Sequence, residues 1–356
     1  VLTYGWEHRE YHDALNIAEF TGATPAAHPL FFLLALLVPL AVLAARKVDA
    51  PLLLVTAGFF VFGVTYQRLT PDFAVLAVLV VAKQLPHLRV RARAWASMLA
   101  LPAVALGAVL WCWNWDRNGT YRFGHGPLEE FFPAEAADFL DKEALPPNLY
   151  NNFETGGYLA FRLFPRYRVF QDGRIPAYPR DFMITPHQTR SGTSWASRLD
   201  KYDINSAVMA IRLLPNYFPG DQWAVVHWDD SFAVVVRRTR VEPRLLERLE
   251  YRYYKPLSPL GPPASAETAR RTEDEIVRNL RGRRAPSWRV LLDLAHLKSL
   301  TARKQEAIAH ITEAEKILPA GRKSQEMLAR EWMFAGRWDL SAAAVERAKR
   351  YPEQRK

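Results

Sequence analysis

Four apolar runs follow one another in the first third of the chain and constrain its fold more than any other feature. They span residues 29–45, 51–66, 72–84 and 97–113. Each is shorter than the roughly 20 residues that a helix needs to cross a bilayer, and the third could instead be re-entrant. The alternative is that they are buried helices of a large globular domain. Since four such runs occur in succession, the sequence predicts a membrane α-helical bundle of about four helices over residues 29–113.

Basic residues are unevenly distributed between these runs. Arg46 and Lys47 follow the first run, and a further basic cluster lies between the third and the fourth. The positive-inside rule then places both loops in the cytoplasm. This predicts a multi-pass protein of the bacterial inner membrane, with residues 1–28 as an extracytoplasmic interfacial segment and everything after Asp116 extracytoplasmic. Arg68, between the second and third runs, either lies among the headgroups or faces a functional cavity.

Other bulk features narrow the class of protein. The first residues lack the basic, apolar and cleavage-site pattern of a signal peptide, so we expect further sequence upstream of Val1. The net charge of +10 does not indicate a nucleic-acid partner, because many Lys and Arg flank the apolar runs or lie on helical surfaces. The single cysteine, Cys112, excludes an intrachain disulfide and a paired-cysteine metal site.

Residues 114–255 mix helix and strand patterns with many Pro and Gly turns, which predicts an extracytoplasmic α/β domain. A strand, a helix and a second strand are expected in that order, which is typical of a βαβ unit whose strand ends hold ligands. The expected elements are a helix over 133–142, a strand over 149–153, a helix over 158–164 entered by Gly156-Gly157, and a strand over 168–171.

A hairpin is predicted later in the same domain. Residues 223–228 and 232–238 are apolar or alternating, and Asp229-Asp230-Ser231 separates them. Asp229 and Asp230 are paired carboxylates, but adjacent residues in a turn point apart, which favours a turn over an acid pair.

Two short runs in this domain carry a resemblance to a known family. The run from Asn151 to Leu159 contains Glu154-Thr155-Gly156-Gly157-Tyr158, and the run from Val169 to Arg174 ends in Asp172-Gly173-Arg174. Together they resemble the extracytoplasmic domain of C-type glycosyltransferases, the multi-pass bacterial enzymes related to oligosaccharyltransferases that use lipid-linked sugars. The resemblance covers residues 1–240.

The chain departs from that family in two respects. It lacks the double-Trp and Asp cluster with which oligosaccharyltransferases grip the acceptor peptide. The family's catalytic carboxylate lies in its first extracytoplasmic loop, which we expect upstream of Val1. Catalytic residues are therefore not identified, and no cofactor is evident, although a divalent metal is compatible with a longer protein.

The resemblance implies a substrate site at the loops of the α/β domain. Glu154 and Asp172 would bind sugar hydroxyls, while Arg174 or Arg68 would meet a phosphate. An ordinary turn also explains Asp172-Gly173-Arg174, and a tight turn explains Gly156-Gly157. The candidate substrate-binding residues are Glu154, Gly156, Gly157, Tyr158, Asp172, Gly173, Arg174 and Arg68.

A metal site is a separate hypothesis. His8 and His12 are four residues apart, which on a helix puts both on one face near Glu7 or Asp13. This arrangement would suit a metal-dependent hydrolase, but a polar interfacial helix explains the same residues.

After a Pro-rich linker over residues 256–265, residues 266–356 repeat with a period of 34. This region resembles the tetratricopeptide repeat, whose paired helices pack through small residues and whose surface docks protein partners. Trp332, Phe334 and Trp338 are expected to fill the core between helices. The recurring positions are Leu294-Ala295 and Leu328-Ala329, Ala302 and Gly336, and Ala314 and Ala348.

These features give two functional expectations. The first is the C-terminal portion of an integral-membrane glycosyltransferase that moves sugar from a polyprenyl-phosphate donor to an envelope acceptor, its catalytic part lying upstream. The second is a non-enzymatic, membrane-anchored tetratricopeptide scaffold for envelope or polysaccharide assembly. The expected partners are the lipid bilayer, a polyprenyl-phosphate sugar and proteins bound by the repeats.

Overall fold

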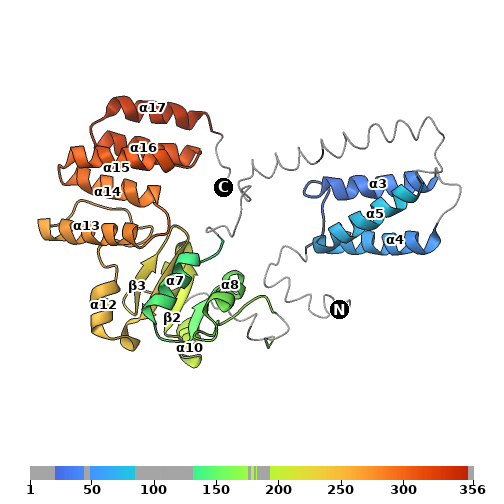
Figure 1. Ribbon diagram of the computed structural model, residues 1–356, viewed down its shortest axis with the longest axis horizontal. Helices are drawn as coiled ribbons and strands as arrows, with labels where there is room; N and C mark the ends of the chain where they lie inside the picture. The colour runs from blue at the N-terminus through green and yellow to red at the C-terminus, as the bar shows by residue number, and fades with distance from the viewer. Residues whose placement is uncertain are drawn as a thin grey trace. The chain divides into compact units, whose positions relative to one another are not determined.

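The computed structural model describes residues 21–43, 49–84, 107, 131–174, 178–179, 182 and 193–351. The chain divides into two compact units (Figure 1). The first unit comprises residues 1–126 and 179–187, and the second comprises residues 127–178 and 188–356.

The described part of the first unit is built on helices α3 (Pro29–Leu43), α4 (Ala50–Thr65) and α5 (Thr70–Gln84). An aromatic cluster holds the three helices together. The ring of Phe31 lies 5.5 Å from that of Phe60 and 4.9 Å from that of Phe73. Contacts of this kind stabilise a helix packing beyond the area that they bury.

The predicted membrane bundle is wrong, although helices do form at the first three apolar runs. Helices of 15 or 16 residues rise at most about 24 Å, whereas a bilayer core is about 30 Å thick. Within the described residues, no helix combines the length and the apolar character needed to cross a membrane. The predicted transmembrane helices and the inner-membrane location are overturned by the same finding. The fourth run, residues 97–113, lies outside the described residues apart from Gly107.

The second unit contains a mixed four-stranded sheet in the order β1-β2-β4-β3. The pair β1–β2 is parallel, and the pairs β2–β4 and β3–β4 are antiparallel. The predicted hairpin is confirmed, because β3 and β4 flank residues 229–231. The strands are β1 (Leu149–Asn151), β2 (Ser206–Ala210), β3 (Trp223–Trp228) and β4 (Phe232–Arg237).

The predicted order of strand, helix and strand is present only in part, because the strand expected over residues 168–171 forms a single bridge. Helix α8 (Phe153–Leu163) follows β1, and Leu149 then pairs in parallel with Val169 through a single bridge. Helix α7 (Ala134–Glu143) begins and ends one residue later than predicted.

Strand residues alternate between two cores, one on each face of the sheet. Val234 and Val236 of β4 pack with Leu140 of α7 and Leu159 of α8. Val235, between them, belongs to the opposite core. That second core also contains residues of α10 (Thr193–Lys201), α13 (Ala266–Arg281) and α14 (Trp288–Leu300), so it continues from the sheet into the C-terminal helical region, residues 266–351.

Helices dominate the rest of the unit, where consecutive elements pack against one another in the order of the chain (Figure 1). Ala295 and Ala307 are fully buried, and Leu328 and Ala329 lie in the same core. Such small residues let helices approach closely. The helices are α12 (Pro243–Leu249), α13 (Ala266–Arg281), α14 (Trp288–Leu300), α15 (Lys304–Ile317), α16 (Arg322–Phe334) and α17 (Trp338–Lys349).

The prediction for the aromatic residues of this region is only partly right. Trp332 is 2% exposed and fills the core. Phe334 is 40% exposed, with its ring edge against His296, and Trp338 is 67% exposed. Trp338 is the first residue of α17.

Candidate functional site

The two halves of the predicted sugar-binding motif meet at the carboxyl end of β1. Gly156 packs so closely on the chain after Val169 that a Cβ there would lie 1.9 Å from the carbonyl oxygen of Gln171. Only glycine permits this approach of backbone to backbone. Asn151 secures the same contact, because its Nδ2 donates to the Gln171 oxygen at 2.7 Å and its Oδ1 accepts from the Phe170 N–H at 2.8 Å.

The Asp172 carboxylate accepts several hydrogen bonds from Arg174. The carboxylate is 2% exposed and accepts from the Arg174 backbone N–H at 2.9 Å. It also accepts from the Arg174 Nε at 3.0 Å and Nη2 at 2.5 Å. The hydrogen bond from the guanidinium holds the pKa of Asp172 below its usual value. Asp172 therefore orients Arg174, whose own side chain is 73% exposed.

Helix α8 presents the remaining motif residues. Glu154 lies exposed in its first turn, Gly157 faces open space, and the Tyr158 hydroxyl accepts a hydrogen bond from Arg162 at 2.8 Å. The predicted entry turn at Gly156-Gly157 is wrong, because both glycines lie inside the helix.

The other predicted site residues are not part of this edge. Arg68 lies exposed in a short 3-10 helix, Gln67–Leu69, of the first unit. His8 and His12 lie outside the described residues.

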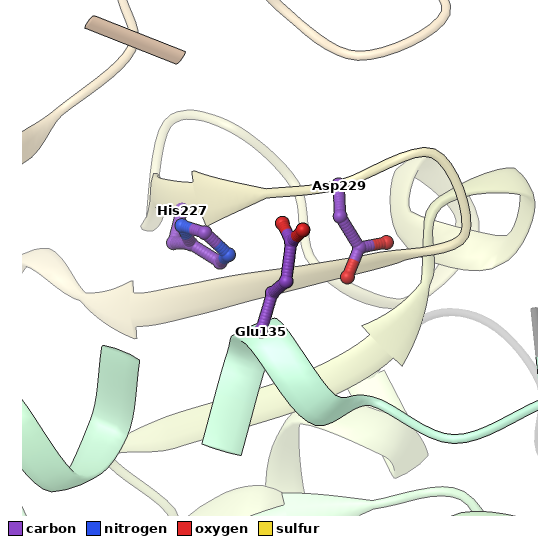
Figure 2. A group of neighbouring side chains, drawn as sticks. All are labelled: Glu135, His227 and Asp229. Carbon is purple, nitrogen blue, oxygen red and sulfur yellow. The ribbon is translucent and has the colours of Figure 1, made fainter. Parts of the chain in front are cut away.

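A second cluster, which the sequence did not predict, is buried on the α7 face of the sheet. Glu135 comes from the first turn of α7, His227 from β3 and Asp229 from the hairpin turn (Figure 2). One potential ligand atom of each lies within 4.8 Å of the others, and the three residues are 8%, 7% and 8% exposed. An imidazole and two carboxylates are donor types that bind divalent transition metals.

A β-bulge turns His227 toward this face. The register of β3 against β4 shifts between Val225 and His227, which leaves Val226 as an extra residue. As a result, two consecutive residues face α7. Val226 packs in the α7 core, and His227 stacks on Phe139 of α7 with ring centroids 4.7 Å apart. Strict alternation would have pointed His227 to the opposite face.

Burial and neighbouring charges set the protonation states in this cluster. Burial lowers the pKa of His227 to about 4, and the nearby Arg283 guanidinium acts in the same direction, so the imidazole is neutral at pH 7. Burial raises the pKa of Asp229, although its Oδ1 accepts from the N–H groups of Ser231 and Phe232. Glu135 accepts from the backbone N–H of Arg284 at 2.9 Å.

Comparison with known proteins identifies no relatives. No family model matches the chain, and neither a curated protein nor a solved structure matches it.

Proposed function

We propose that the α/β domain recognises a phosphorylated saccharide and belongs to a sugar-transferring enzyme. The observation that carries this proposal is the contact of Gly156 with Gln171, which brings the first turn of α8 beside the Asp172–Arg174 loop. Polar groups from two distant segments thereby share the carboxyl edge of a parallel strand pair, a common position for ligands in α/β domains.

The chemistry of this edge suits such a ligand. The exposed Glu154 carboxylate can accept hydrogen bonds from sugar hydroxyls. Arg174 has an exposed guanidinium whose remaining donors suit a phosphate oxygen. Asp172 acts in this proposal as a positioning residue for Arg174 rather than as a ligand.

Ligand titration of the full chain tests this assignment. We expect a hexose 1-phosphate, followed by calorimetry or NMR, to bind more tightly than the free hexose. Glu154→Gln and Arg174→Gln each remove a charge-assisted hydrogen bond and should weaken binding on the order of tenfold or more. The matched changes Glu247→Gln and Arg244→Gln, on the exposed surface of α12, should leave affinity unchanged. Equal affinity in all four variants, or no binding at all, rejects the proposal.

A second candidate function, docking of a partner protein, is favoured by the outer face of α17. Ile311 of α15 is fully buried in the core that α15 shares with α14 and α16. Its counterpart 34 residues later, Val345 of α17, is 43% exposed, and Trp338 lies on the same helix. Because α16 packs against α15 at the equivalent position, the occupant that fits this face is an amphipathic helix of a partner.

An additional repeat fused to the chain tests whether α17 accepts such a helix. A second copy of residues 320–351 appended after residue 351 should bury Trp338 and protect it from acrylamide quenching, with Trp338→Phe identifying its signal. Trp338→Glu in the fused chain should abolish any gain in unfolding free energy. Unchanged quenching of Trp338 would show that the face does not accept a helix.

A further inference from the structure

We propose that Glu135, His227 and Asp229 bind one divalent transition-metal ion, with Zn²⁺ as the best fit to their donor atoms. The inference is independent of the proposed sugar recognition, since none of these residues lies at the carboxyl edge of β1. The site would join α7 to the β3–β4 hairpin (Figure 2).

The donor set fits Zn²⁺. One imidazole nitrogen and two carboxylate oxygens make three protein ligands, and a water molecule commonly supplies the fourth in such sites. Tetrahedral ligands around Zn²⁺ lie about 3.3 Å apart, so donor atoms now within 4.8 Å need to approach one another. Side-chain rotations of Glu135 can provide this movement, because its carboxylate ends a chain of three rotatable bonds.

The His227 imidazole gives a second observation that points to a metal ligand. Its side chain is 7% exposed, and its Nε2 has no hydrogen-bond partner among the described residues. Figure 2 shows the imidazole directed toward the Glu135 carboxylate, with Asp229 on the other side of that carboxylate. Buried polar atoms are nearly always satisfied, so an unpartnered nitrogen that faces two carboxylates indicates that a cation completes the group.

The surrounding contacts hold the ligands in position. Asp229 uses Oδ1 to accept two backbone N–H groups of the hairpin turn, and its other oxygen takes no part in that turn. Phe139 stacks on the His227 ring, and the Arg284 N–H fixes the Glu135 carboxylate. Since Arg284 lies in the loop between α13 and α14, a bound ion would also anchor this loop to α7.

Metal binding to the full chain tests the proposal directly. The protein is treated with a chelator, dialysed, and then titrated with Zn²⁺, and with Co²⁺ for its visible absorption bands. We expect one equivalent of metal to bind per chain. The visible absorption bands of bound Co²⁺ should be those of an ion coordinated by nitrogen and oxygen atoms. His227→Gln and Asp229→Asn should weaken binding by more than about tenfold, because each removes a direct ligand or its charge. Asp229→Asn keeps an oxygen for the turn N–H groups, so it should fold even if His227→Gln does not.

A histidine outside the cluster provides the control. His310→Gln, on α15, should bind metal like the unaltered chain. The proposal fails if the unaltered chain binds no ion after chelation, or if Asp229→Asn binds it equally well. It also fails if Glu135→Gln raises the melting temperature equally with and without Zn²⁺, because the two carboxylates would then share a proton instead of a metal.

Discussion

Replacement of Ala302 by glycine should stabilise the helical region. Helices α14 and α16 end in the same way: the Arg303 N–H donates to the Lys298 carbonyl at 2.8 Å, and the Arg337 N–H donates to the Trp332 carbonyl at 2.9 Å. Such a hydrogen bond requires the residue just after the helix to adopt the left-handed backbone conformation. That residue is Gly336 in the second case, with φ of 82°, but Ala302 in the first, with φ of 61°.

The structure gives the size of the effect. A left-handed conformation costs an alanine about 1–2 kcal/mol, which glycine avoids. Glycine, however, loses more conformational entropy on folding, which offsets about 0.5–1 kcal/mol of this gain. The Ala302 side chain is exposed, so no packing is lost. Ala302→Gly should therefore raise the free energy of unfolding by about 0.5–1 kcal/mol. The melting temperature would rise by about 2 °C in a unit of this size.

The reverse change at the equivalent position is the matched control. Gly336→Ala should destabilise the protein by a similar amount, because the nearest atom to the new Cβ is the flexible Lys304 Nζ at 3.6 Å, which leaves only the backbone cost. Urea unfolding followed by circular dichroism measures both variants. A loss of stability in Ala302→Gly, or no loss in Gly336→Ala, would refute the reasoning.

Three further predictions concern stability. Gly156→Ala should lower the free energy of unfolding by more than about 2 kcal/mol, because its Cβ would collide with a backbone carbonyl. Gly157→Ala, in open space within the same helix, should leave stability unchanged or raise it, and thermal unfolding measures both variants. In urea titrations, Trp332→Ala should lower the free energy of unfolding by about 3–5 kcal/mol and Trp338→Ala by under about 1 kcal/mol. Equal losses would contradict the different burial of the two side chains. Burial raises the pKa of Asp293 from 3.8 to about 6, so its contribution to stability is present below pH 3.8 and is lost as the pH rises to 6. Asn at this position should therefore lessen the fall in melting temperature between pH 4 and 6, and identical pH profiles would argue against this role.

Much of the second unit could be predicted from local pattern. The hairpin around residues 229–231, helix α7 and the order of β1 followed by a helix follow from alternation and from turn residues that act over short distances. The 34-residue period likewise located α14–α17, because each hairpin repeats the same small and large positions. Local pattern could not separate the buried Trp332 from the exposed Trp338, since burial depends on which helix follows.

The first unit shows where hydropathy alone misleads. Apolar composition located α3, α4 and α5 and gave their lengths to within two residues, but it did not fix their environment. Asp49 begins α4 by accepting the Leu52 N–H, and the extended backbone of Tyr66 ends it after 16 residues. Thr70 then begins α5. Composition measures preference for an apolar environment, whereas helix length is set by such local stops.

The sequence by itself determined the repeats, the hairpin and the residues of the sugar-binding hypothesis, because all of these depend on neighbours along the chain. Only the tertiary structure assembled Glu135, His227 and Asp229. In the sequence, β1, α8, α10, β2 and β3 lie between Glu135 and Asp229, and no local signal marks the extra residue at Val226. That one-residue bulge places His227 on the α7 face of the sheet instead of the opposite face, since side chains on a strand alternate with a period of two.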